Sequence, residues 1–207
     1  MSHYFMGDDT EHDYREIEFG MGGRTYRFKT DRGVFSRDKV DFGSSLLIET
    51  VIKDKAAFQA SGNFIDMGAG YGPIGITLGD ILDMKPVMVE VNEDAVVICR
   101  ENAEKNDVEA VVMARMEYDS SETPEADLYV TNPPFRAGKP VVLDIIKDAH
   151  HVLPAGGVFY MVVQKKQGMP SYKKAVASIF GDAESVGHAK GYHVLKGIKN
   201  CQGKKLT

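Results

Sequence analysis

Residues 63–75 read Asn-Phe-Ile-Asp-Met-Gly-Ala-Gly-Tyr-Gly-Pro-Ile-Gly, and this stretch decides the fold. A short apolar run ends at Asp66, and the glycines that follow at alternate positions let the main chain turn sharply and approach a ligand without obstruction by a Cβ atom. Pro73 suits the first turn of a helix, where its missing N–H leaves no hydrogen bond unmade. A strand, a glycine turn and a helix in this order predict a nucleotide-type binding loop at one edge of a parallel sheet.

The pattern continues beyond this loop, because short apolar runs alternate with amphipathic stretches from residue 63 onward. Such alternation is typical of a parallel sheet with helices on both faces. We expect strands at residues 63–67, 86–91, 110–114, 126–131 and 157–164, and helices at residues 73–83, 93–106, 139–152 and 171–180. Residues 183–188 and 192–198 predict a closing hairpin, since their connection is too short for a helical crossover. The sequence therefore predicts a Rossmann-like α/β fold: a mostly parallel seven-stranded sheet with one antiparallel strand.

The first 60 residues precede this pattern and have a different one. Residues 14–19 and 24–29 alternate polar and apolar side chains around Gly-Met-Gly-Gly, as the strands of a β-hairpin do, and residues 43–58 predict a helix. No internal repeat, low-complexity tract or linker separates this part from the rest. We therefore expect an N-terminal extension of hairpin and helix over residues 1–60, packed on a domain over residues 61–207 that carries the binding loop.

Composition limits the class of protein. Hydrophobic residues make up 43% and charged residues 27% of the chain, as in ordinary globular domains. Residues 1–9 show no basic start followed by an apolar stretch, so we expect no secretion signal, and no apolar run approaches the ~18 residues of a membrane span. Cys99 and Cys201 belong to no Cys-x-x-Cys pair, and the His150-His151 pair closes a helix without a third ligand. We expect a cytoplasmic protein with no metal centre, in which Cys99 is a packed thiol.

Charge is unevenly distributed along the chain. A net charge of -5 argues against a protein that coats nucleic acid by charge alone. Residues 24–39 nevertheless hold six Lys and Arg against two acids, and five lysines follow Glu184 with no further acid. These stretches are either solvated loops or an RNA-facing surface, and the sequence leaves both interpretations open.

The residues around the glycine loop select the cofactor. Residues 70–75 also satisfy the G-x-G-x-x-G pattern of dinucleotide enzymes, and Glu90 follows at roughly the 20-residue offset of a ribose-binding acid. The pattern alone therefore leaves a dehydrogenase possible. The Asp66 carboxylate, however, would repel a pyrophosphate and attract a cationic amino acid tail. Glu90 then offers two oxygens to the two ribose hydroxyls. These features favour S-adenosylmethionine.

A second element follows the expected strand 126–131, at the same sheet edge as the glycine loop. An exocyclic amine has a delocalised lone pair and is a poor nucleophile unless acceptors hold its hydrogens in a more tetrahedral arrangement. Here Asn132 offers a side-chain carbonyl and Pro133 a main-chain carbonyl. The two prolines fix the backbone, and Phe135 supplies a flat ring for a stacked base. No general base is needed. The expected catalytic residues are Asn132, Pro133, Pro134 and Phe135.

With both elements present, the sequence resembles the small-domain family of class I methyltransferases. This family includes bacterial 16S ribosomal RNA guanine-N2 methyltransferases and their single-domain relatives. The resemblance runs from about residue 14 to residue 199. It is most specific at residues 33–38 (Gly-Val-Phe-Ser-Arg-Asp) with 41–44 (Asp-Phe-Gly-Ser), 66–75, 132–139 and 190–196.

The resemblance implies the roles of the site residues. The methionyl part of the cofactor would lie on residues 66–70, the ribose on Glu90, and the target base on residues 132–135. Relatives usually carry Ser-Asp after the third strand, with the acid near the adenine amine, whereas this chain has Ala-Arg-Met-Glu at residues 114–117. Glu117 or main-chain groups around Met116 would replace that contact. The implied cofactor-binding residues are Phe35, Ser36, Asp66, Met67, Gly68, Ala69, Gly70, Glu90, Val91, Met116 and Asn132.

The leading hypothesis for function is methyl transfer from S-adenosylmethionine to the exocyclic N2 of a guanine in 16S-type ribosomal RNA, with residues 61–207 as the methyltransferase domain. The same Asn-Pro-Pro-Phe element could serve adenine N6 or a protein glutamine. A third hypothesis, from another class, is a catalytically silent RNA-binding module that retains the fold. The intact glycine loop and Asn132 argue against that module.

Overall fold

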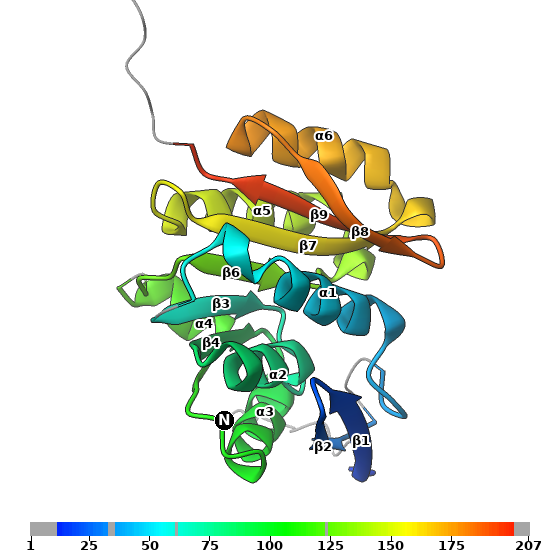
Figure 1. Ribbon diagram of the computed structural model, residues 1–207. Helices are drawn as coiled ribbons and strands as arrows, with labels where there is room; N and C mark the ends of the chain where they lie inside the picture. The colour runs from blue at the N-terminus through cyan, green and yellow to red at the C-terminus, as the bar shows by residue number, and fades with distance from the viewer. Residues whose placement is uncertain (1–11, 33–35, 61, 123, 201–207) are drawn as a thin grey trace, which may run out of the picture.

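The computed structural model describes residues 12–32, 36–60, 62–122 and 124–200 of the chain. Seven strands form one sheet in the order β5-β4-β3-β6-β7-β9-β8, and β9 alone runs antiparallel to its neighbours (Figure 1). The predicted Rossmann-like fold is confirmed. The strands of this sheet are β3 (Asn63–Met67), β4 (Lys85–Glu90), β5 (Val111–Ala114), β6 (Leu128–Thr131), β7 (Val158–Gln164), β8 (Glu184–Ala189) and β9 (Tyr192–Ile198).

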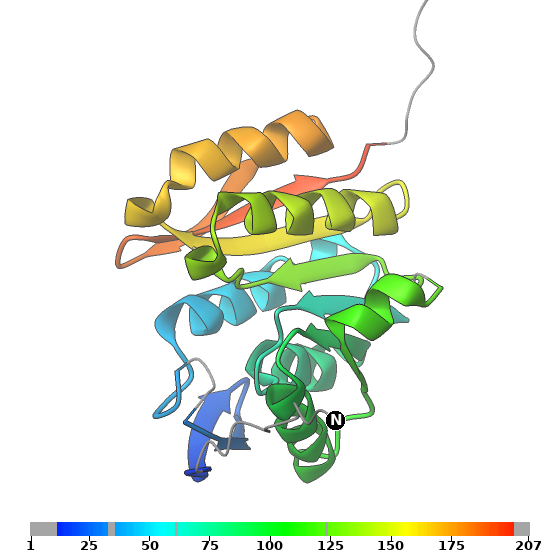
Figure 2. The ribbon, with the colours of Figure 1, turned by 180° about the vertical axis from the view of Figure 1, so that it is seen from behind.

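Helices cover both faces of the sheet, as the alternating pattern predicts. One face carries α1 and α2 (Figure 1) together with α3, and the opposite face carries α4, α5 and α6 (Figure 2). The helices are α1 (Phe42–Lys53), α2 (Pro73–Leu82), α3 (Glu93–Lys105), α4 (Arg115–Ser120), α5 (Lys139–Val152) and α6 (Met169–Phe180), with 3-10 turns η1 (Lys55–Ala57), η2 (Phe135–Ala137) and η3 (Lys165–Gln167).

The strand order creates a switch point. The chain moves from β3 outward to β4 and β5, then crosses back to lay β6 on the other side of β3. In an open α/β sheet, ligands bind outside the carboxyl ends of the strands at such a reversal. The fold therefore places the glycine loop after β3 and the Asn-Pro-Pro-Phe element after β6 side by side.

The predictions differ from the structure at two helices. The helix expected over residues 43–58 ends at Lys53, where Asp54 caps it and the 3-10 turn η1 follows. The short helix α4 was not expected at all. Six residues are fewer than two helical turns, so they give no periodic apolar pattern that could indicate a helix.

The N-terminal hairpin consists of β1 (Arg15–Met21) and β2 (Arg24–Thr30). Gly22 and Gly23 form its two-residue turn with φ of 61° and 82°, as a type I′ turn requires. Asn102 of α3 donates to the carbonyl of Lys29 and accepts from its N–H, at 2.9 and 2.7 Å. Asn106, one turn later, makes the same pair of bonds with Arg27. These two side-chain amides thus supply hydrogen-bond partners for the main-chain groups of Arg27 and Lys29 on the edge of β2 that faces away from β1. The division at residue 60 into extension and methyltransferase domain stays a prediction.

Candidate functional site

The two predicted loops meet at the carboxyl edge of the sheet. The Thr131 hydroxyl donates to the carbonyl of Met67 at 2.7 Å and so joins the ends of β6 and β3. A Cβ atom on Gly68 would lie 3.9 Å from the carbonyl oxygen of Asn132. The glycine loop and the Asn-Pro-Pro-Phe element are therefore in direct van der Waals range.

The glycine loop is hydrogen-bonded to the sheet on one side and open at Gly70 on the other. The N–H groups of Gly68 and Ala69 both donate to the carbonyl of Val89 on β4, at 2.8 and 3.1 Å. Gly70 has φ of 59°, and a Cβ atom there would meet nothing within 4 Å. In contrast, a Cβ atom on Gly75 would stand 2.5 Å from the sulfur of Met88. Gly75 thus permits close packing of α2 on the sheet, while Gly70 leaves an open surface that a ligand can approach.

Asp66 lies fully buried under this loop. One carboxylate oxygen accepts from the N–H of Gly75 at 2.8 Å, and the other has no partner among the described residues. Burial raises the pKa of Asp66 to about 7, against the opposing hydrogen bond from Gly75. An unsatisfied buried acceptor is costly unless a cation or donor comes to it. This arrangement fits the cationic amino acid tail of S-adenosylmethionine.

Glu90 closes the other side of the loop. Its carboxylate accepts three main-chain N–H bonds, from Gly70 at 2.9 Å, Val91 at 2.8 Å and Asn92 at 3.0 Å. A carboxylate has about four acceptor positions, so these bonds occupy most of its capacity. Glu90 therefore fixes the loop to the end of β4, which is a role that the sequence did not suggest.

Two apolar side chains stand exposed beyond the ends of β4 and β5. Glu90 pairs with Ala114 across these strands, so the residues that follow lie next to each other. Val91 is 75% and Met116 83% exposed. Both side chains are thus accessible to a ligand that lies on the glycine loop. Arg115, at the position where relatives carry an acid, donates to the Asp119 carboxylate at 2.7 Å and to the sulfur of Met67, at the end of β3, at 3.3 Å.

Asn132 is oriented by two residues at the N-terminus of α1, the cap residue Asp41 and Ser44. Its side-chain N–H₂ donates to the Ser44 hydroxyl at 3.0 Å and to the Asp41 carboxylate at 3.3 Å. A carboxylate can only accept, so the amide nitrogen must face Asp41 and the amide oxygen must point the other way. Asp41 also caps α1 through the N–H of Ser44, at 3.0 Å. The helix N-terminus thus fixes which end of the Asn132 amide is presented to a substrate.

The remaining residues of the element are placed by packing. Pro133 is buried, and its carbonyl accepts from the N–H of Phe135 at 2.9 Å. The carbonyl keeps a second lone pair for another donor. Phe135 packs edge-on against Tyr172 of α6, with ring centroids 5.4 Å apart, while Pro134 is exposed.

Ser36, in the segment between β2 and α1, also lies at the site. The Tyr71 hydroxyl donates to the carbonyl of Ser36 at 3.4 Å, which brings Ser36 next to the glycine loop. Phe35 lies outside the described residues. Sequence reasoning missed Asp41 and Ser44 as site residues, although both belong to a motif of the resemblance. Their contact with Asn132 spans about 90 positions, and no local pattern could reveal it.

The strand order, the glycine loop after β3, the acid that ends β4 and the Asn-Pro-Pro-Phe element after β6 together define a class I S-adenosylmethionine-dependent methyltransferase. Comparison with known families gives the same result in finer detail. The methyltransferase small domain family matches residues 25–196, and the chain belongs to this family.

Individual relatives differ in how much they reveal. The chain is 39% identical to the uncharacterized protein YbxB of Bacillus subtilis over 87% of its own length and 90% of that protein. It is 30% identical to ribosomal RNA small subunit methyltransferase C of Shewanella pealeana, over 81% of this chain and 48% of the relative. The chain thus spans about half the length of the ribosomal RNA methyltransferases that it matches.

A solved structure shows the same arrangement. The 16S rRNA N2 G1207 methyltransferase of T. thermophilus, in complex with AdoMet and guanosine, superposes with a TM-score of 0.79 at 27% identity, over 90% of this chain and 51% of that one. The family and the class I fold assign S-adenosylmethionine as the cofactor. No helix among the described residues is both long and apolar enough to cross a membrane, and no three His, Cys, Asp or Glu side chains there gather into a metal site.

Proposed function

We propose that this protein methylates the exocyclic N2 of a guanine in small-subunit ribosomal RNA. The observation that carries the proposal is the pinned amide of Asn132, whose oxygen is turned away from Asp41 beside the glycine loop. The relatives named as ribosomal RNA small subunit methyltransferases support that RNA as the substrate, and the solved N2 G1207 methyltransferase that holds guanosine supports guanine as the target.

The cofactor would lie across the loop between β3 and β4. Residues 66–70 would hold its methionyl part, with Asp66 facing the cationic amine, and Glu90 would accept from the ribose hydroxyls in partial exchange for its main-chain bonds. Val91 and Met116 would enclose the adenine between apolar side chains. Phe35, Ser36 and Asn132 would border the rest of the pocket. Bound S-adenosylmethionine supplies an electrophilic methyl group on a positively charged sulfur.

The acceptor amine would be handled by Asn132 and Pro133. The side-chain oxygen of Asn132 and the carbonyl of Pro133 each accept one N–H of the amine, which favours the tetrahedral arrangement that attack requires. Both acceptors are fixed before the substrate arrives, so they need no reorganisation during the reaction. Phe135 and Pro134 would contact the flat face of the base. After the methyl group has been transferred, the acceptor nitrogen can lose its proton to solvent, so no side chain is needed as a base.

A labelled-methyl assay tests this assignment. The purified protein is incubated with S-adenosylmethionine labelled in the methyl group and with RNA, DNA or protein fractions from cells that lack the gene. We expect label in small-subunit ribosomal RNA, and mass spectrometry should map it to an N2-methylguanine that is missing in those cells. Label in adenine or in a protein glutamine would replace the guanine assignment. Failure of the cofactor to bind in calorimetry would favour the silent module.

A further inference from the structure

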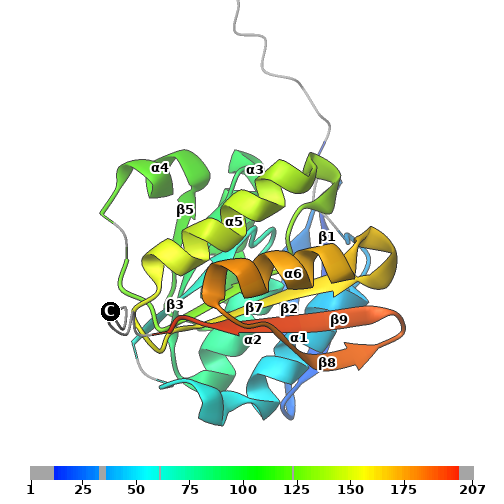
Figure 3. The same cartoon turned by 90° about the horizontal axis from the view of Figure 1, so that it is seen from above.

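Charge divides this chain into two unequal parts. Residues 149–207 contain nine lysines and only two acids, Asp182 and Glu184, whereas residues 1–148 contain 16 Lys and Arg and 28 acids. In the fold, the lysine-rich part supplies β7, α6, β8 and β9, which form one end of the sheet (Figure 3). Among the described residues, acids outnumber bases in the part that supplies β3 to β6 (the cofactor half), and lysines outnumber acids in the part that supplies β7 to β9 (the basic half).

The basic stretch over residues 24–39 contributes little free charge. Five of its six cations pair with acids from other parts of the chain: Arg24 with Asp80, Arg27 with Glu18, Lys29 with Glu101, and Arg32 and Arg37 with Asp13. Among the described residues, only Lys39 of this stretch forms no salt bridge, so most of its charge is compensated. A surface that faces RNA, which the sequence left open, must therefore lie in another part of the molecule.

Uncompensated cations gather at the carboxyl edge of the basic half. Lys165 and Lys166 begin η3, directly after β7, and Lys190 lies in the turn between β8 and β9. All three are exposed, and no acid among the described residues forms a salt bridge with any of them. The N–H of Lys165 donates to the carbonyl of Gly191 at 2.8 Å and so holds the two segments together.

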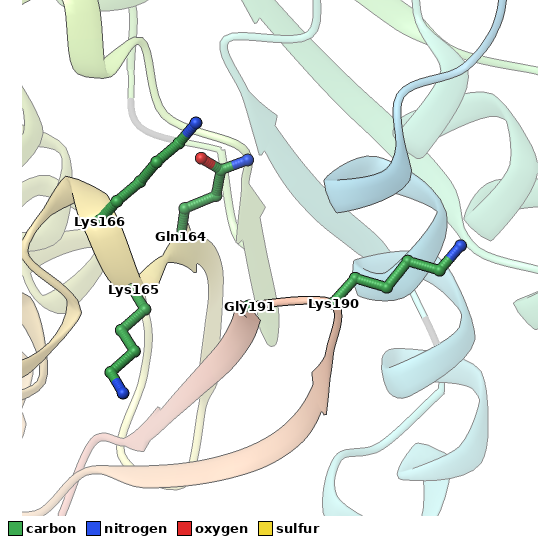
Figure 4. A pocket seen from close by; sticks show the side chains of 5 residues that line it. All are labelled: Gln164, Lys165, Lys166, Lys190 and Gly191. Carbon is green, nitrogen blue, oxygen red and sulfur yellow. The ribbon is translucent and has the colours of Figure 1, made fainter.

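These lysines line a shared hollow. It has a volume of about 490 Å³ and is bordered by Gln164, Lys165, Lys166, Lys190 and Gly191 (Figure 4). Figure 4 shows the Lys166 side chain on one side of the Gln164 amide and the Lys190 side chain on the other, pointing away from it, while Lys165 extends in a third direction. The cations are thus spread over a length of surface, as the phosphates of a strand are, and do not converge on one point.

This hollow adjoins the acceptor site. The Lys190 ammonium lies 4.7 Å from the ring centroid of Phe42, the residue after Asp41, which orients Asn132. On the other side, β7 pairs with β6, and Thr131 at the end of β6 is followed by Asn132. Two further cations flank the element on η2 and α5, namely Arg136 and Lys139, and neither forms a salt bridge within the described part of the chain.

We propose that Lys165, Lys166 and Lys190 bind the phosphate backbone of the RNA strand whose base enters the acceptor site. This inference rests on the proposed function, since it assumes a nucleic acid substrate. Phosphate contacts fix the register of a strand and do not read its sequence, whereas the base is recognised by the element around Asn132. The acidic cofactor half would repel the same backbone and thus favour one orientation of the strand.

The test compares two triple variants with the same change in net charge. The first carries Lys165→Gln, Lys166→Gln and Lys190→Gln. The control carries Lys53→Gln, Lys55→Gln and Lys85→Gln, which lie at the end of α1, in η1 and at the start of β4, on the opposite edge of the sheet. Binding to transcribed small-subunit ribosomal RNA is measured between 50 and 200 mM salt, next to cofactor affinity and turnover.

Three phosphate contacts to a single strand contribute about 2 to the slope of log affinity against log salt concentration. Over that fourfold range of salt, the unaltered protein should lose roughly 20-fold more affinity than the site variant. We expect the site variant to have a raised KM for RNA, an unchanged kcat and an unchanged cofactor Kd. The control variant should follow the unaltered protein.

The failures of the two proposals are distinguishable. If the site variant matches the control in RNA affinity and salt slope while the unaltered protein still methylates RNA, the lysines do not bind the backbone and the proposed function stands. If the unaltered protein binds cofactor but neither binds nor methylates RNA, the proposed function itself is wrong, and the surface proposal is overturned with it.

Discussion

The orientation of Asn132 by α1 predicts the effect of a single hydroxyl. Ser44→Ala removes the shorter of the two hydrogen bonds on the Asn132 amide and leaves the 3.3 Å contact with Asp41. The cap of α1 survives, because it uses the N–H of Ser44 and not its side chain. The amide can then rotate or tilt, and its oxygen spends less time where an amine could donate to it.

The magnitude follows from the value of one hydrogen bond. A bond between uncharged groups contributes about 1 kcal/mol to stability. If that energy holds the amide in the orientation that the transition state needs, its loss lowers kcat about fivefold, since about 1.4 kcal/mol corresponds to a factor of ten. The KM for cofactor should not change, because the Ser44 hydroxyl bonds to Asn132 and, within the described residues, makes no hydrogen bond to the glycine loop.

Ser45→Ala is the matched control. The Ser45 hydroxyl donates to the carbonyl of Asp41 at 3.1 Å, so this variant also loses one hydrogen bond in the first turn of α1 but none to Asn132. Both variants should lose about 1 kcal/mol in the free energy of unfolding. Only Ser44→Ala should lose activity in single-turnover methyl transfer. Equal turnover in the two variants at saturating cofactor would show that the Ser44 contact does not orient the amide.

Three other perturbations have defined outcomes. Asn132→Ala should reduce methyl transfer by about 100-fold or more, as expected for loss of a preorganised acceptor, and leave the cofactor Kd in calorimetry nearly unchanged. Gly70→Ala adds a Cβ atom toward open space at φ of 59°, so it should cost about 1 kcal/mol in unfolding free energy and weaken cofactor binding more than tenfold; unaltered binding would place the cofactor elsewhere. Burial raises the pKa of Asp66 from 3.8 to about 7. At a pH between these two values, Asp66 is therefore protonated in the folded apoprotein and ionised in the unfolded chain. The apoprotein's unfolding free energy should therefore fall by about 3 kcal/mol from pH 5 to pH 8, relative to Asp66→Asn, in urea titrations without cofactor.

Sequence patterns predicted what local chemistry determines. The apolar run before Asp66, the alternate glycines and Pro73 specify a strand, a turn and a helix whatever the rest of the chain does, and β3 and α2 begin at the expected residues. The short link before Tyr192 likewise could only be a hairpin, and β9 is the reversed strand. Where the signal was short, as at α4, the prediction failed.

The site could be predicted only as two separate loops. That both follow strand ends on one edge was predictable from a parallel sheet, but their neighbours were not. The bond from Asn102 to the carbonyl of Tyr71 joins α3 to the glycine loop, and the same amide satisfies the edge of the hairpin. Such contacts depend on how the helices pack on the sheet, and the spacing of residues in the sequence does not predict that packing.

The division of charge connects the two proposals. A cofactor that carries a positive sulfur is favoured in a half of the sheet where acids outnumber bases, and Asp66 and Glu90 stand at its loop. A polyanion is favoured in the other half, where three lysines surround one hollow. Asn132 lies at the junction, because β3 and β6 are neighbours at the point where the strand order reverses. Under the proposed function, methyl donor and acceptor would meet there. If charge guides each to its own side, then high salt should raise the KM for RNA steeply while leaving the affinity for the cofactor, which is held mainly by short contacts in a buried loop, much less affected.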